Sequence, residues 1–259
     1  AVLSLIMMGI GCQTSLPSAS NTEQISDNTK RFCSPDGTLT EQLTKHGFYS
    51  YCIVPQNQLS ILPGTPTNYS FTIVNNEGNT VKEFSITHEK LIHVVLVSED
   101  LQEFQHLHPT LNTETGVFTL ENLTFKTNGT HYLYANFIAP DNMELPEERA
   151  TVLATNILTV GTEKPQQPQP RQKDLADKTV DGFDVRLEKD GGPASPIFAQ
   201  EETNLTLTVH KGAQQPAALE PYLGELGHLV VIKQDTHDYI HAHPIRTEEA
   251  SQVHFTVPF

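Results

Sequence analysis

The sequence is short of positive charge and of the motifs that mark common enzymes. Lysine and arginine together number 16, against 31 aspartates and glutamates, and the formal net charge is −15. A chain this acidic is repelled by phosphate backbones, so we expect no nucleic-acid partner. The chain also lacks a G-x-S-x-G elbow, a P-loop, a dinucleotide fingerprint and a C-x-x-C pair. No nucleophile or acid–base pair stands out, and we expect no enzymatic activity.

Long apolar runs are also missing. The N-terminal apolar stretch, residues 1–12 (AVLSLIMMGIGC), is shorter than the roughly 20 residues that a bilayer-spanning helix needs. It fits the apolar part of a secretory signal. Its end resembles a bacterial lipobox, in which Cys12 would become the lipidated N-terminus. The alternative is an ordinary secretory signal with an incidental cysteine. Both interpretations predict an extracytoplasmic protein, and the lipobox adds membrane anchoring through the lipid.

Only three cysteines are present, and Cys33 and Cys52 remain after the signal. In an oxidising compartment we expect a disulfide between them. The alternative is a Cys/His metal site that uses His46, although such sites usually contain a close C-x-x-C pair. Residues 13–54 are therefore expected to form a polar tether followed by a disulfide-closed loop region.

Short alternating segments begin near residue 55, for example YSFTIVN and IHVVLVS, and turn residues separate them. Period-two alternation of Val, Ile, Thr, Phe and Tyr predicts antiparallel strands, and no long helical pattern competes. We expect an all-β protein with two tandem Ig-like antiparallel β-sandwich domains. The expected bounds are residues 55–160 for the first domain, 161–177 for a Pro/Gln-rich linker, and 178–259 for the second domain.

The two expected domains contain an internal repeat. The stretch LIHVVLVSEDLQEFQHLHP (residues 91–109) aligns without a gap with LGHLVVIKQDTHDYIHAHP (residues 226–244), at an offset of 135 residues. Three histidines, a proline and an aspartate coincide. After this stretch the second copy reaches only VHFTVPF, so by analogy it lacks its last two strands. We therefore expect a truncated second domain and a chain that is shortened at both ends.

The repeated stretch predicts a β-hairpin that gathers histidines. Residues two apart in a strand share a face, so His106 and His108 point the same way. If Val97 pairs with Phe104, His93 lies opposite His108 on that face. A slip of one residue would send His93 to the other face. His131, in a later strand, is a further candidate ligand.

A transition-metal ion is the sharpest interpretation of this pattern, because neutral imidazoles suit Cu(II), Zn(II) or Ni(II). The predicted mature chain has one methionine, Met143, which does not support a methionine-rich Cu(I) site. We expect copper or zinc as the bound ion. The candidate ligands in the two hairpins are His93, His106, His108, His228, His241 and His243.

The histidine pattern also allows functions other than metal binding. The histidines could be structural, in which case the protein is a non-catalytic adhesion or assembly module. The segment His88–His93 (HEKLIH) has one residue too many for the HExxH motif of metalloproteases and lies in strand context. The HxH followed by a glutamate is similar to part of a cupin motif. A preceding glycine and a second cupin motif are both missing.

These hairpins, HVVLVSEDLQEFQHLHP and YLGELGHLVVIKQDTHDYIHAHP, resemble those of bacterial extracytoplasmic proteins labelled YtkA-like or heavy-metal-associated secreted proteins. The resemblance covers about residues 60–259. It implies tandem β-sandwiches outside the membrane and a link to copper handling. It also implies that the six hairpin histidines are the motif positions.

Overall fold

The structure is a computed structural model, and its described residues fall into two compact units, one up to residue 161 and one from residue 177. The residues that the structure describes are 51–57, 60–75, 77–140, 151–161, 177–192, 195–198, 201–212, 215–232, 239–245 and 250–259. We call the described residues up to 161 the N-terminal unit and those from 177 the C-terminal unit. Cys12 and Cys33 lie outside the described residues. Lipidation and the Cys33–Cys52 pairing therefore stay predictions, as do the domain bounds.

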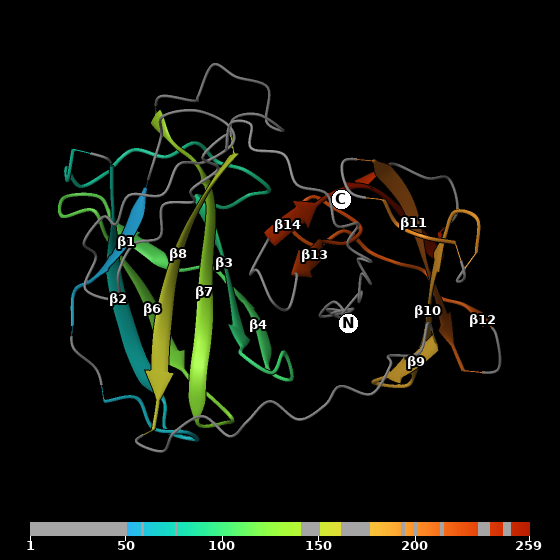
Figure 1. The fold of residues 1–259 in the computed structure, drawn as a ribbon, viewed down its shortest axis with the longest axis horizontal. Helices are drawn as coiled ribbons and strands as arrows, with labels where there is room; N and C mark the ends of the chain where they lie inside the picture. The colour runs from blue at the N-terminus through green and yellow to red at the C-terminus, as the bar shows by residue number, and fades with distance from the viewer. Residues whose placement is uncertain are drawn as a thin grey trace, which may run out of the picture. The chain divides into compact units, whose positions relative to one another are not determined.

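The N-terminal unit is built of two four-stranded antiparallel sheets (Figure 1). One sheet has the order β1-β2-β6-β5 and the other has the order β4-β3-β7-β8. The strands are β1 (Cys52–Pro55), β2 (Thr67–Val74), β3 (Ile92–Ser98), β4 (Phe104–Leu107), β5 (Thr110–Asn112), β6 (Val117–Leu123), β7 (Gly129–Ile138) and β8 (Thr151–Val160).

Alternate residues of both sheets meet in one hydrophobic core. Phe71 of β2 stacks on Phe118 of β6 with ring centroids 5.6 Å apart. Val94 and Leu96 of β3 lie in the same core and are fully buried. Two sheets with their apolar faces packed together form a β-sandwich, so the predicted fold class is confirmed. The Ig-like part of that prediction stays a prediction.

The register of the β3–β4 hairpin is the predicted one. Val97 pairs with Phe104, and Val95 pairs with His106. Since Val94 and Leu96 face the core, the odd-numbered residues of β3 face outward. His93 therefore lies on the outer face of its sheet, together with the two histidines of the HxH motif.

The C-terminal unit repeats part of this topology. Its main sheet has the order β15-β16-β11-β10-β9, with β12 beside β11, and β13 pairs with β14 in a second sheet. Figure 1 labels strands β9 to β14 of this unit. The strands are β9 (Asp177–Val180), β10 (Phe183–Lys189), β11 (Glu202–Lys211), β12 (Gln215–Pro216), β13 (Leu229–Ile232), β14 (Tyr239–Ala242), β15 (Pro244–Ile245) and β16 (Gln252–Pro258).

The internal repeat is visible in the strand order and in the hairpin register. The order β10-β11-β16-β15 repeats β1-β2-β6-β5. Val230 pairs with His241 and Ile232 with Tyr239, at positions equivalent to the pairs of the first hairpin. Among the described residues, β3 lies between β4 and β7, whereas β13 pairs with β14 alone. The described part of the chain contains no helix long and apolar enough to cross a membrane.

Candidate metal centres

The N-terminal unit brings three imidazoles together at the end of the β3–β4 hairpin. His93 is fully buried, and His106 and His108 are partly buried. Nδ1 of His93 lies 3.2 Å from Nε2 of His106 and 3.1 Å from Nε2 of His108. One ligand nitrogen from each ring lies within 4.8 Å of the other two. This first triad can hold a metal ion.

A backbone carbonyl fixes the tautomer of His93. Its other nitrogen, Nε2, lies 3.0 Å from the carbonyl oxygen of Thr87. Because a carbonyl can only accept, Nε2 must carry the proton and donate it. The Nδ1 atom is then left with a lone pair that points at His106 and His108. Metal-ligating histidines typically have such an outer hydrogen bond, which orients the ring and raises its basicity.

The nitrogen separations match those of ligands on a shared ion. Two imidazole nitrogens bound at about 2.0–2.1 Å with a tetrahedral angle lie about 3.3 Å apart. The N···N distances of 3.2 and 3.1 Å in the first triad are close to this value. The lone pair of Nδ1 cannot accept two full hydrogen bonds in the ring plane. A metal ion would satisfy all three nitrogens at once.

The C-terminal unit holds an equivalent second triad. His228, His241 and His243 again offer ligand nitrogens that lie within 4.8 Å of one another. The ring centroid of His228 lies 5.6 Å from that of His241 and 5.8 Å from that of His243. The corresponding distances from His93 are 5.4 and 4.9 Å. The second triad is therefore slightly wider around its first histidine.

In each unit, a two-residue turn supplies the backbone carbonyl that lies at Nε2 of the first triad histidine. The sequence analysis did not predict this turn. Thr87 and Lys90 exchange two backbone hydrogen bonds, of 2.8 and 3.0 Å. Between them, His88 and Glu89 have φ angles of 45° and 63°. Positive φ at both central residues is the signature of a type I′ turn. This turn presents the Thr87 carbonyl to His93.

The second turn follows the same plan. Tyr222 and Glu225 exchange backbone hydrogen bonds across Leu223 and Gly224, which both have positive φ. The carbonyl of Tyr222 lies 3.3 Å from Nε2 of His228. Gly224 was the available signal, because glycine is common at positive φ in such turns.

His131 is not a ligand of the first triad, which corrects the expectation. It pairs across the sheet with Ser98, at the opposite end of β3 from His93 and on the core-facing side. Its Nε2 lies 3.2 Å from Oε2 of Glu103, and both side chains are buried. Glu103 also accepts backbone N–H groups of Lys126 and Thr127. The pair holds a loop to the hairpin.

A buried tyrosine shares the outer face with the histidines of the first triad. Tyr134 of β7 pairs with Val95 and shares its face. Burial raises the pKa of the Tyr134 hydroxyl well above its usual range, so the hydroxyl is protonated in the metal-free chain. The ligand atoms that converge in this region are the imidazole nitrogens of the triad.

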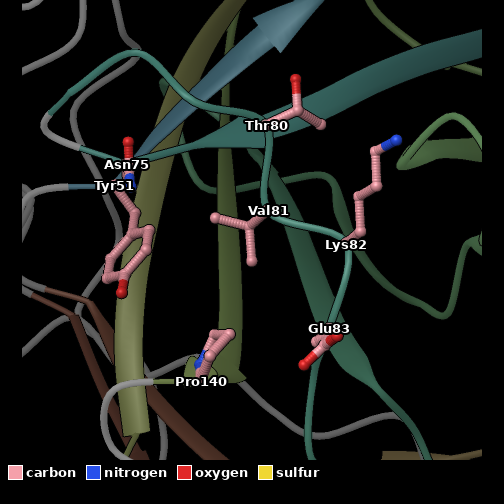
Figure 2. Close-up of a pocket in the computed structure, with 7 residues that line it drawn as sticks. All are labelled: Tyr51, Asn75, Thr80, Val81, Lys82, Glu83 and Pro140. Carbon is pink, nitrogen blue, oxygen red and sulfur yellow. The ribbon is translucent and has the colours of Figure 1, made fainter.

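A hollow of about 320 Å³ lies elsewhere in the N-terminal unit and contains none of the six histidines. Figure 2 shows its lining, which is Tyr51, Asn75, Thr80, Val81, Lys82, Glu83 and Pro140. The Lys82 ammonium donates to the carbonyl of Glu114 at 2.7 Å. The hollow has no cluster of convergent polar groups, so the triads remain the candidate site.

Cys52 at the start of β1 is disulfide-bonded, and its partner is not among the described residues. This state is the one expected of a protein in an oxidising compartment. It also argues against a Cys/His site with His46, since a disulfide sulfur is not a thiolate ligand.

Comparison with known proteins gives one family match. A family model described as a domain of unknown function (DUF8832) matches residues 54–152 and residues 178–259, one stretch in each unit and together more than half of the chain. No curated protein matches the chain.

Proposed function

The chain belongs to the DUF8832 family, whose description assigns no function, and we propose that it binds copper or zinc ions through its two histidine triads. The observation that carries the proposal is the position of His93. Two other imidazole nitrogens converge on its Nδ1 at 3.1 and 3.2 Å. Its Nε2 is committed to a backbone carbonyl.

The proposed ion is borderline in softness. Nitrogen donors from imidazole suit Cu(II) and Zn(II), whereas Ca(II) and Mg(II) prefer oxygen donors. Three protein ligands leave a coordination position for water or for a ligand from a partner. Such a site suits a protein that buffers or hands on an ion.

We further propose that the protein works outside the cytoplasm and is anchored by a lipid on Cys12. The short apolar stretch that ends in Gly11-Cys12 supports this proposal. The disulfide at Cys52 also supports it, because disulfides persist in oxidising compartments. We expect the expressed full-length protein to be labelled by a radioactive fatty acid. The Cys12→Ser variant should not be labelled.

Calorimetric titration of the metal-free full-length chain with Zn(II), and separately with Cu(II), tests the binding proposal. We expect about two ions per chain, one for each triad. A chain that takes up neither ion at micromolar concentrations would contradict the proposal. The histidines would then be structural, as in an adhesion or assembly module.

A further inference from the structure

The two triads are equivalent in their strands but differ in the turn that precedes each of them. His88 occupies the first central position of the turn in the N-terminal unit. Leu223 occupies the same position in the C-terminal unit. An additional imidazole therefore lies beside the first triad, and an aliphatic side chain lies beside the second.

We propose that His88 is the fourth ligand of the first site, and that the second site keeps its fourth position open. This inference rests on the proposed function, since it concerns the coordination number of the same two sites. A metal held by four imidazoles is retained, as in structural zinc sites. A metal held by three imidazoles can exchange the water or other ligand in its fourth position, as in open zinc sites.

The spacing between His88 and His93, the first histidine of the triad, is compatible with this role. The ring centroids of two imidazoles on one ion, bound with a tetrahedral angle, lie about 5.2 Å apart. His88 and His93 have centroids 6.1 Å apart, in an edge-on arrangement. A shift of roughly 1 Å toward His93 would give the two rings the spacing of ligands on one ion.

The turn couples His88 directly to the triad. The residue before His88 is Thr87, whose carbonyl holds Nε2 of His93. The turn that carries His88 therefore also orients His93, a ligand of the triad. In the second unit the equivalent carbonyl distance is 3.3 Å, against 3.0 Å in the first. In this proposal the second site has one ligand fewer, and its first histidine lies slightly farther from the carbonyl that orients it.

A reciprocal exchange of the two turn residues tests the inference. Non-glycine side chains occupy this left-handed position in both units, with φ angles of 45° and 54°. His88→Leu and Leu223→His therefore introduce no new kind of backbone strain. Each exchange is made in a full-length chain with a single intact triad. His241→Ala removes the second triad, and His106→Ala removes the first.

Zn(II) affinity is measured by competition with a chromophoric chelator, and Co(II) absorption reports the coordination number. In the His241→Ala chain, we expect His88→Leu to weaken Zn(II) binding about 10-fold or more and to reduce the visible Co(II) absorption. In the His106→Ala chain, we expect Leu223→His to strengthen Zn(II) binding by a similar factor. Circular dichroism confirms the fold of each protein.

A change of less than about threefold on His88→Leu would overturn the inference, because the loss of a ligand costs more than that. If His88→Leu does not fold, the Leu223→His protein decides by the same threshold. If neither single-triad chain binds Zn(II) even before the exchange, the proposed function itself fails. That result differs from Zn(II) binding that is unchanged by His88→Leu or Leu223→His, which would contradict only the further inference.

Discussion

At the scale of single residues, His93 and His228 differ from the other four triad histidines. A backbone carbonyl lies at Nε2 of each, at 3.0 and 3.3 Å, so these two rings are held whether or not an ion is bound. Each of the other rings comes from the HxH motif of its hairpin. We therefore expect the histidines of a triad to contribute unequally to folding and to binding.

His108→Ala separates metal binding from a structural role. We expect it to remove one of two bound ions and to change the free energy of unfolding of the metal-free chain by less than about 1 kcal/mol. The measurements are Zn(II) titration and urea unfolding with and without chelator. His210→Ala, on β11 and outside both triads, is the control and should bind two ions. An equal loss of stability with and without chelator would favour structural histidines.

Glu103→Ala should destabilise the fold and leave metal binding intact. It removes the partner of the buried His131 and the acceptor of the Lys126 and Thr127 amides. Loss of one member of a buried pair costs about 3–5 kcal/mol. Metal uptake should be retained under folding conditions, because His131 lies at the other end of β3 from His93. Urea unfolding of the metal-free chain measures the loss, and a change below about 1 kcal/mol would refute it.

The error over His131 shows which part of a site sequence can predict. Alternation places His106 and His108 on one face, because the period of a strand is two. It says nothing about which face of a distant strand meets them. His131 pairs with Ser98 and therefore faces the core, while His93 faces outward. The face on which His131 lies depends on the register between β3 and β7, which no local pattern in the sequence specifies.

At the scale of elements, the hairpin was predictable and the turn before it was not. Strand β3 is apolar, and Leu107 of β4 packs against the core opposite Val94, so a slip of one residue would turn Leu107 outward. The Thr87–Lys90 turn carries no glycine, so its sequence has no turn signal. Its equivalent does carry Gly224, and comparison of the two copies could have identified it.

Glu89→Gly should stabilise the N-terminal unit. Glu89 has a φ angle of 63°, and the equivalent residue, Gly224, has a φ angle of 80°. A left-handed backbone costs a non-glycine residue about 1–2 kcal/mol, and the flexibility of glycine in the unfolded chain offsets part of the gain. We expect a net gain of roughly 0.5–1 kcal/mol in urea unfolding. A loss of stability would show that the Glu89 side chain contributes contacts of its own.

At the scale of the whole molecule, the chain carries the same hairpin twice in different sheet surroundings. Strand β3 has a neighbour on each side, whereas β13 pairs only with β14 among the described residues. A strand paired on one side is held less firmly against local opening. We expect hydrogen exchange at the amides of Leu229–Ile232 to be faster than at those of Val94–Val97. Mass spectrometry of the intact chain compares the two segments, and equal rates would contradict this expectation.

Metal binding should also raise the thermal stability of the whole chain. An ion that binds only the native state adds about 2.7 kcal/mol when its free concentration is 100 times Kd. We expect Zn(II) to raise the Tm of the chain, and the combined variant His106→Ala, His241→Ala to show no rise. A rise of equal size in both proteins would assign the effect to other surface groups.

Elemental analysis of the full-length protein, purified without added metal, tests the central claim most directly. The combined variant His106→Ala, His241→Ala, prepared in parallel, corrects for adventitious ions. The account predicts copper or zinc in the wild-type protein, approaching two ions per chain, and none above background in the variant. Equal metal content in the two proteins, or no copper or zinc in the wild-type protein, would contradict it.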